Sequence, residues 1–513
     1  MSASPVRYDR WKAPAEDGRV LIWPNASDLI ADTIENHRRL AGTDSAPIQN
    51  VPFSEVRRQM RRWLGHDDGQ MLVATGHQTE LHHPGVWAKN ALIDAVASKT
   101  GGRAFHFAVD TDEPKHLVVR WPGGAEALTD DASTRPLEWS GLMAPPTPAH
   151  LKHIEDEFAQ AAAKWSFQPL VPGFLASMRR LSLGGANLSA TLTEALHQFD
   201  WNLGLRYDAM LVSPICFSEP YLLFVHHVLA RAGEFAGDYN AALDQFRREN
   251  KIRTPGRPMP NLKISADSCE VPFWLDELST GARTRASVIR QGDRWSLRAH
   301  AGEPFEFDQA IDGWTAASHL LNWLRRNSLR LSPRALTLTA VLRLLVADQF
   351  VHGIGGGLYD QVLDALIVRH FGIEPPRFSV TTATLFFPEA VGQPRVCLPC
   401  MVQEGRRLKH GILGPKKMQL VERISALPRR STQRSKLFYQ MHDELSSAWA
   451  LPQVRSWEER FRDAEARAQE EKVLFDRELF YAIQSRERLT ALIDRYRQEV
   501  GPLTPSPSGR GLG

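Results

Sequence analysis

Histidine, amide and hydroxyl side chains gather in one short segment of the chain. Imidazole, carboxamide and hydroxyl groups can donate hydrogen bonds to phosphate or carboxylate oxygens, and imidazole also transfers protons near neutral pH. The candidate residues are Thr75, Gly76, His77, Gln78, His82 and His83. A structural turn needs fewer polar groups, so we predict an active-site loop in which His77 is catalytic and the others bind substrate or nucleotide.

An acidic cluster follows the apolar run Ala104–Val109. Asp110, Asp112 and Glu113 lie within four positions, and such carboxylates could hold Mg²⁺, orient an ammonium or hydroxyl group, or act as a general base. We predict that Asp110 and Asp112 are catalytic, with Asp110 the partner of a substrate ammonium. No resident metal site is predicted.

A glycine-rich segment precedes a helical pattern at Gln361–Phe371. Its candidate binding residues are His352, Gly353, Gly355, Gly356, Tyr359 and Asp360. Glycines let a backbone approach a ligand closely, and amides at a helix start can bind an anion. Counting from Gly353, leucine stands where a dinucleotide-binding motif has its third glycine. An anion cradle and a tight structural turn both remain open.

The surrounding elements should bring these segments together. The apolar run Met71–Ala74, the helical pattern Val86–Ala97 and the run Ala104–Val109 have the length of a β-α-β crossover, and Pro84 favours a helix start. Two parallel strands would open on the same sheet edge. We therefore predict an α/β fold with one site at the carboxyl ends of its strands.

Length and composition limit the class of protein. The 513 residues are 43% hydrophobic and 24% charged, as in globular proteins, and predict several domains. Lys and Arg total 62 against 59 for Asp and Glu, so neither nucleic acid nor a membrane surface is an expected partner. No apolar run has transmembrane length and no secretory signal is visible, so we expect a cytoplasmic protein that acts on small molecules.

Pattern changes divide the chain into predicted segments. They are an N-terminal arm with helices (1–65), the first part of the core (66–135), a helical insertion (136–200), a core strand and helix (201–235), a small β-rich insertion (236–330), a return to the core with the glycine loop (331–400), a helical region (401–500) and a disordered tail (501–513). Apolar residues at helical spacing between 416 and 499 predict long helices in a hairpin or coiled coil. These helices either cover the same subunit or form a homodimer interface.

Four cysteines are present: Cys216, Cys269, Cys397 and Cys400. The last two form the sequence Cys-Leu-Pro-Cys. A redox or zinc role would require a thioredoxin-like context or a second pair of ligands, and the sequence shows neither. We expect buried or incidental thiols.

The chain resembles the putative cysteine-adding enzyme family of bacillithiol synthesis, BshC. Thr75-Gly76-His77-Gln78 is similar to that family's Thr-Gly-Gln-Gln turn, and Phe107 to Glu113 is similar to its acidic strand end, usually Glu-Asp-His-Asp. Phe350 to Gly357, followed by Tyr359, is similar to its late Ile-Gly-Gly loop. The likeness covers residues 70–400 as scattered motifs. It departs from the family at His77, at His82-His83-Pro84 and at Asp112, which stands where the family has histidine.

The resemblance implies a Rossmann-like core related to class I aminoacyl-tRNA synthetases, with inserted modules and a dimerising coiled coil. It also implies a ligase that joins the carboxyl group of cysteine to the amine of glucosaminyl-malate, with activation by ATP and Mg²⁺ as a candidate ion. Two other functions stay open. One is a metal-dependent nucleotide-sugar transferase using Asp110 and Asp112, and the other is a non-catalytic homodimeric binding protein.

Overall fold

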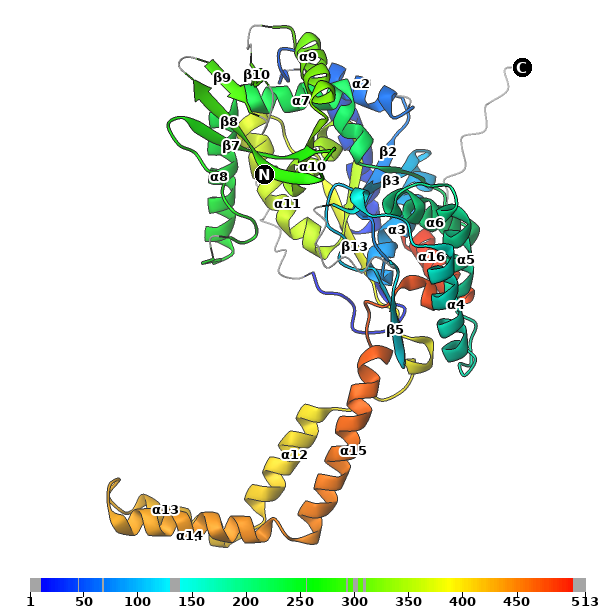
Figure 1. Ribbon diagram of the computed structural model, residues 1–513. Helices are drawn as coiled ribbons and strands as arrows, with labels where there is room; N and C mark the ends of the chain where they lie inside the picture. The colour runs from blue at the N-terminus through cyan, green and yellow to red at the C-terminus, as the bar shows by residue number, and fades with distance from the viewer. Residues whose placement is uncertain are drawn as a thin grey trace, which may run out of the picture. The chain divides into compact units, whose positions relative to one another are not determined.

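The computed structural model describes residues 11–44, 46–66, 69–129, 139–254, 256–291, 294–298, 303–307 and 311–501. These residues form two compact units (Figure 1). The larger contains Met1–Leu385 and Arg477–Gly513, and the smaller contains Phe386–Asp476. Every candidate site residue lies in the larger unit.

A six-stranded sheet organises the larger unit. Its strands, in spatial order, are β1 (Val20–Trp23), β13 (Phe378–Ala383), β12 (Gln349–His352), β2 (Leu72–Gln78), β3 (Arg103–Val109) and β6 (Asp208–Leu211). Strands β13 to β6 are mutually parallel, and β1 pairs antiparallel with β13 at one edge. The predicted α/β class with parallel strands is confirmed.

The predicted β-α-β crossover is present. Strands β2 and β3 pair in parallel along their whole length, and α3 (Pro84–Thr100) joins them. Pro84 occupies the first turn of α3, as predicted. The predicted active-site loop, however, begins later than expected, because β2 continues through Thr75 to Gln78. These four residues are therefore part of a strand, not a turn.

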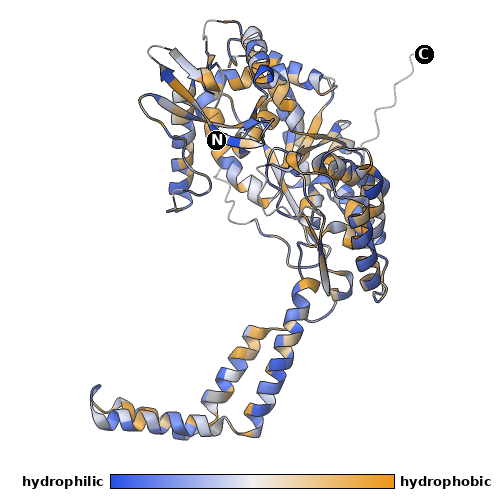
Figure 2. Cartoon of the chain, in the orientation of Figure 1, coloured by the Kyte–Doolittle hydropathy of each residue, from blue (hydrophilic) through white to orange (hydrophobic). Residues whose placement is uncertain are grey.

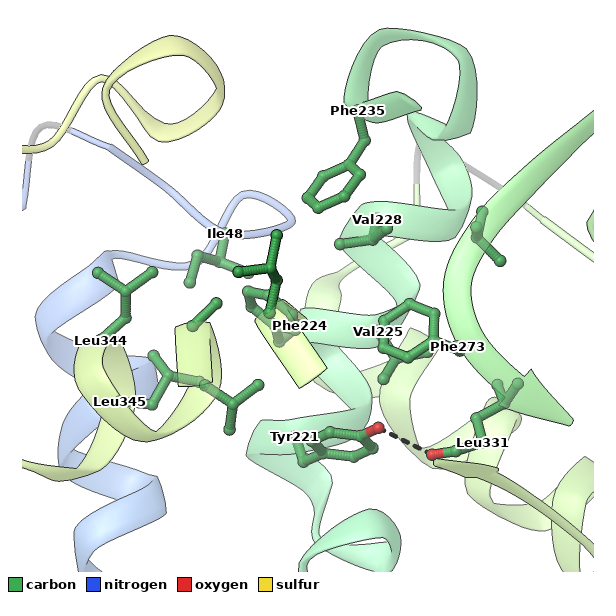
Figure 3. Close-up of a cluster of buried hydrophobic side chains, with 14 of the residues drawn as sticks. Ile48, Tyr221, Phe224, Val225, Val228, Phe235, Phe273, Leu331, Leu344 and Leu345 are labelled. Carbon is green, nitrogen blue, oxygen red and sulfur yellow. Dashed lines mark hydrogen bonds between the residues drawn. The ribbon is translucent and has the colours of Figure 1, made fainter. Parts of the chain in front are cut away.

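The two faces of the sheet are covered by different helices. Helix α3 packs on one face together with α1 (Ala26–Ala41) and α16 (Arg486–Val500). Helix α11 (Ile354–Leu366) packs against β12 and β13. A large apolar core lies on the side of Phe105, Phe107 and Phe350. Figure 3 shows part of this core, in which the hydroxyl of Tyr221 donates to the carbonyl oxygen of Leu331 at 2.8 Å.

Two insertions separate the core strands. The first, between β3 and β6, contains β4 (Val118–Trp121), β5 (Gly124–Ala127), η2 (Ser140–Leu142), α4 (Pro148–Ala162), α5 (Val171–Ser182) and α6 (Leu188–Leu203). The second, between β6 and β12, begins with η3 (Ser213–Phe217), α7 (Glu219–Ala230) and α8 (Ala232–Glu249), and ends with α9 (Gly313–Arg326), α10 (Ala335–Val341) and η4 (Leu342–Val346). This insertion also contains an antiparallel sheet. Its strands β7 (Ser268–Glu277), β8 (Ala282–Gln291), β9 (Arg294–Leu297) and β10 (Phe305–Glu306) lie between α8 and α9 in the chain, and β11 (Leu329–Pro333) lies between α9 and α10.

The remaining elements belong partly to the larger unit and partly to the smaller unit. They are α2 (Phe53–Trp63), η5 (Ile367–Phe371), η6 (Pro388–Ala390), α12 (Leu398–Gly411), α13 (Gly414–Ser425), α14 (Thr432–Ala448), α15 (Pro452–Leu474) and η7 (Tyr481–Ile483). In the smaller unit α12 packs on α15, and α13 packs on α14. Hydrophobic and hydrophilic residues are interspersed along these helices (Figure 2).

The helical region predicted at 401–500 is divided between the units. Helix α16 packs on α3 in the larger unit and buries Leu489, Leu492, Ile493 and Tyr496. The sequence left open whether these helices cover the same subunit or form a dimer interface. Helix α16 covers the same subunit. The predicted tail at 501–513 lies, after Gly501, outside the described residues.

Candidate functional site

The topology singles out one place on the sheet. From β2 the chain proceeds through β3 to β6 on one side, whereas β12 and β13 extend the sheet on the other side. The strand order therefore reverses between β2 and β12. In open α/β sheets ligands bind at the carboxyl edge of this switch point, because the helices after the two central strands lie on opposite faces and leave a crevice. The histidine segment covers the end of β2 and the loop after it, and the glycine segment covers the end of β12 and the start of α11.

The end of β2 is tightly integrated into the sheet. The hydroxyl of Thr75 is buried and donates to the carbonyl oxygen of Val351 on β12 at 2.7 Å. A Cβ atom on Gly76 would lie 3.2 Å from the carbonyl oxygen of Phe107. Thr75 and Gly76 therefore hold the sheet together. The side chain of Gln78 donates to Asp112 at 3.1 Å, which links the ends of β2 and β3.

His77 forms a pair with Glu80 in the loop after β2. Its Nε2 atom lies 2.9 Å from Oε1 of Glu80, and 21% of the imidazole side chain is exposed. The other carboxylate oxygen of Glu80 accepts hydrogen bonds from the amides of Lys115 and His116 at 2.8 and 3.2 Å. Glu80 thus fixes both His77 and the loop after β3. One edge of the His77 ring remains directed away from this pairing.

His82 and His83 have separate roles. His82 is buried, and its ring lies 5.2 Å from that of His77 and 5.6 Å from that of His106 on β3. His83 is the N-cap of α3, where its Nδ1 accepts the amide of Gly85 at 3.1 Å. An N-cap acceptor stabilises the first turn of a helix. His83 is therefore a capping residue, and His82 extends the histidine cluster inward.

Burial keeps the imidazoles neutral at pH 7. The pKa values of His77 and His82 lie well below the ordinary value because of burial, and the positive charge of Lys89 lowers both further. Burial likewise lowers the pKa of His83 to about 4. Neutral imidazoles can donate from one ring nitrogen and accept at the other. The cluster therefore offers hydrogen bonds without a fixed positive charge.

Lys89 is the cationic group of this cluster. It lies on α3, is only 3% exposed, and its Nζ donates to the carbonyl oxygen of Gly76 at 2.7 Å. Burial lowers its pKa to about 7, although Glu80 acts in the opposite direction. A lysine that titrates near neutral pH can transfer protons or present a cation at the strand end. Lys89 is not among the residues predicted from the sequence, because a lysine inside a helical pattern resembles any solvated residue.

The acidic strand end is less open than predicted. Asp110 is buried, and its Oδ1 accepts the amide of Ser213 in the turn after β6 at 2.8 Å. Burial raises the pKa of Asp110, and the hydrogen bonds from Ser213 lower it in part. Asp112 is exposed, and its two oxygens accept from Gln78 and from the amide of Glu113. Asp110 thus fastens β3 to β6, whereas Asp112 faces solvent.

Two residues of the glycine segment, His352 and Asp360, form a buried triad with Arg343 of η4. Nε2 of His352 lies 2.8 Å from Oδ2 of Asp360, and Arg343 donates to the same oxygen at 2.6 Å. Burial alone would raise the pKa of Asp360, but His352 and Arg343 outweigh it and lower the value. A Cβ on Gly356 would meet Nδ1 of His352 at 2.8 Å. His352, Asp360 and Gly356 therefore form a packed support for the start of α11.

The start of α11 is accessible. Gly353 is the N-cap, and no side chain among the described residues caps this end. Gly355 and Gly356 are exposed, and a Cβ on Gly353 or Gly355 would meet no atom within 4 Å. Tyr359 is 41% exposed one turn further along. Free amides at a helix start favour an anion.

The histidine segment and the glycine segment reach the same edge of the sheet, but His77 and His352 lie on opposite faces of it. Side chains alternate along a strand, and Phe350, which pairs with Ala74, lies on the same face as His352. By the same alternation His77 and His106 lie on the face covered by α3, where His106 bonds to Asn90. The loops therefore border the switch point, but the rings of His77 and His352 do not share one enclosed pocket.

A small cavity lies under the histidine loop. It measures about 20 Å³ and is bordered by side chains that include Gln78, His82, Asn90, His106 and Tyr207. This volume suffices for about one water molecule and not for a substrate. A much larger cavity, about 680 Å³, lies at the other edge of the sheet beside Arg103 and Asp208, where β3 and β6 begin. A substrate of the predicted site must therefore bind over the loops.

A three-ligand metal geometry occurs away from the acidic strand end. Among the residues that the structure describes, the ligand atoms of Glu234, Asp238 and His370 lie within 4.8 Å of one another. Asp110 and Asp112 are not part of such a group in these ranges. The geometry therefore gives no support to a metal site held by both aspartates.

Comparison of the chain with protein-family models gives no match, and comparison with curated proteins gives none either. In the described ranges, no helix combines the length and the apolar character needed to cross a bilayer.

Proposed function

We propose that the chain is an ATP-using carbon–nitrogen ligase of the bacillithiol type that acts in the cytoplasm. Its parallel sheet would be a Rossmann-like core related to that of class I aminoacyl-tRNA synthetases. It would join the carboxyl group of an amino acid, cysteine in the family, to the amine of an amino-sugar conjugate such as glucosaminyl-malate. The observation that carries the proposal is the uncapped, glycine-rich start of α11 next to the histidine loop of β2, at the switch point of the parallel sheet.

The residues at this edge suit an anionic ligand. The amides of Ile354, Gly355 and Gly356 lie in the first turn of α11, where helix amides and the helix dipole attract phosphate. The N–H of the neutral His77 ring, which Glu80 accepts in this structure, is the donor that would turn to a phosphate oxygen when ATP binds. ATP, when bound, supplies the activation of the carboxyl group. The protein's part is to hold phosphate oxygens as negative charge develops in the transition state.

Proton transfer in this proposal belongs to Lys89 and Glu80. Amide formation requires the attacking amine to lose a proton. Lys89, whose pKa burial lowers to about 7, can exchange a proton at neutral pH. Glu80 pairs with His77, the residue that follows the Gly76 carbonyl to which Lys89 donates. Asp112 is the carboxylate with solvent access and is the candidate for Mg²⁺, whereas Asp110 remains the proposed partner of a substrate ammonium.

The proposal is tested by ATP binding to two variants at one position. Gly355→Glu places a carboxylate at the helix start, which suits the helix dipole but repels phosphate, and Gly355→Ala adds only a methyl group in open space. Calorimetric titration should show at least about tenfold weaker ATP binding for Gly355→Glu and wild-type binding for Gly355→Ala. Equal ATP affinities in the two variants would place the nucleotide elsewhere, and no ATP binding by the wild type would end the proposal.

We further propose that the smaller unit forms a homodimer. Large apolar side chains are exposed on its helices and the turns between them: Met418, Val421, Phe438, Tyr439, Trp449 and Leu451. Exposed apolar surface on paired helices favours a partner, and a second copy of the chain is the partner proposed.

A further inference from the structure

The pair Cys397 and Cys400 lies at the start of α12 and is joined by a disulfide. Both residues are exposed and bonded to each other, so the expectation of buried thiols is wrong for this pair. Cys397 is the N-cap of this 14-residue helix, and Pro399 lies in its first turn. Both cysteines therefore lie at the surface of the protein.

The helix start favours a thiolate on Cys397. The amide of Cys400 donates to Sγ of Cys397 at 3.2 Å, and a sulfur that accepts this bond lies at the positive end of the helix dipole. Cysteines at helix starts are the ones whose thiolates are stabilised, because amide donors and the dipole both favour negative charge. Cys397 is consequently the nucleophile of the pair and Cys400 its resolving partner.

The disulfide is a weak covalent brace. It closes a loop of four residues, for which the loss of chain entropy is worth about 2 kcal/mol, against about 4.7 kcal/mol for a 100-residue loop. Helix α12 has other anchors. The indole of Trp457 on α15 donates to the carbonyl oxygen of Met401 at 3.0 Å, and its ring packs where Gly405 has no side chain. Reduction can thus occur without release of the helix.

The other two cysteines contrast with this pair. Cys216 and Cys269 are buried, and burial raises their pKa values to about 12 and about 11. Such thiols stay protonated and out of reach of reagents while the protein is folded. Alkylation of the folded protein should therefore report on Cys397 and Cys400 without a contribution from Cys216 and Cys269.

We propose that Cys397 and Cys400 form a reversible redox site that exchanges electrons with low-molecular-weight thiols. For oxidation, the Cys397 thiolate attacks one sulfur of a small disulfide RSSR, forms a mixed disulfide and releases RS⁻. The Cys400 thiolate then attacks Sγ of Cys397 and expels the second RS⁻. Two protein thiols lose two electrons and two protons, and RSSR becomes two RSH. Reduction is the reverse. This inference is independent of the proposed ligase activity.

The experiment uses the folded full-length protein and glutathione as the probe. Wild type is equilibrated in mixtures of reduced and oxidised glutathione, quenched with iodoacetamide and weighed by intact-mass spectrometry. Zero adducts are expected under oxidising conditions and two under reducing conditions, with a reversible transition between them. A disulfide that withstands a hundredfold excess of reduced glutathione until the protein is unfolded would overturn the proposal, as would two thiols that never pair.

Two single variants then assign the roles. Cys400→Ser should trap a stable mixed disulfide on Cys397, since the resolving thiol is missing. At pH 7 its Cys397 should be alkylated about fivefold faster than Cys400 in the matched Cys397→Ser variant. Equal rates in the two variants, or absence of the mixed disulfide, would contradict the proposed order. The wild-type titration needs no substitution, so it decides the question even if a variant fails to fold.

Discussion

The ammonium group of Lys89 on α3 lies 2.7 Å from the carbonyl oxygen of Gly76, the residue before His77 on β2. This bond attaches a buried cation to the strand end that carries His77. Burial of a lysine is costly, and the hydrogen bond to Gly76 offsets only part of that cost, because burial still lowers the pKa of Lys89 to about 7. A lysine with a strongly shifted pKa at a sheet edge is a candidate for a functional role.

Lys89 should make stability depend on pH. Its folded pKa, about 7, is below the unfolded value of about 10.4, so the unfolded state binds more protons between these limits. The destabilisation is full below pH 7 and fades as the pH rises towards 10. Relative to Lys89→Met, wild type should gain up to about 1.4 kcal/mol per pH unit in that window. Urea unfolding of both proteins at pH 7, 8 and 9 measures the difference; parallel curves would show that Lys89 is not buried as described.

His83 should contribute to acid sensitivity. Its folded pKa, about 4, is below the unfolded value of 6.5, so its stabilising effect is complete above pH 6.5 and is lost as the pH falls. His83→Asn keeps an N-cap acceptor but does not titrate. Between pH 7 and pH 5 the variant should lose about 2 kcal/mol less stability than wild type. Thermal or urea unfolding at the two pH values tests this, and His83→Ala should cost about 1 kcal/mol at pH 7 through loss of the cap.

His77 should matter for turnover if the chain activates a carboxyl group with ATP. Loss of one donor to phosphate oxygens in the transition state lowers kcat by about 10²-fold, with a smaller effect on KM. His77→Ala should show this loss, and His77→Gln, which restores an amide donor, should recover part of it. His153→Ala, an exposed histidine on α4, is the matched control. Wild-type constants in His77→Ala would make the histidine loop structural.

Asp110 separates a binding role from a packing role. Asp110→Asn keeps an oxygen that can accept the amide of Ser213, so stability should stay near wild type. Affinity for an amine substrate should fall, because the variant lacks the negative charge proposed to bind the ammonium group. Asp110→Ala removes the acceptor and should cost about 1–3 kcal/mol. Asp112→Asn, at an exposed position, should leave stability unchanged. Unchanged substrate affinity in Asp110→Asn would limit Asp110 to fastening β3 to β6.

The proposed homodimer depends on exposed apolar residues of α13 and α14. Met418 is 71% exposed and Tyr439 67%, and replacing both by glutamate places charges within the proposed interface. Light scattering at micromolar concentration should show a dimer for wild type and a monomer for the double variant. Leu183→Glu, at another exposed apolar position in the larger unit, should remain dimeric. A monomeric wild type would exclude this interface.

The sequence by itself determined the local elements and their order. Apolar runs and helical spacing predicted β2, α3 and β3, because these signals depend on neighbours in the chain and on the proline that starts α3. The sequence also placed polar residues at the ends of β2, β3 and β12. The parallel order of the strands, inferred from the crossover length, brought those ends to one edge.

Only the tertiary structure decided how the side chains are used. Strand β1 was missed as part of an irregular arm, because it forms by pairing with β13 more than 350 residues later in the chain. Asp110 and Asp112 looked alike in the sequence. In the structure Asp110 is buried against Ser213, whereas Asp112 is exposed to solvent. Lys89 became a site residue because α3 lies across the strand end. The alternation of side chains across the sheet put His77 and His352 on opposite faces, since strand register is fixed by long-range pairing.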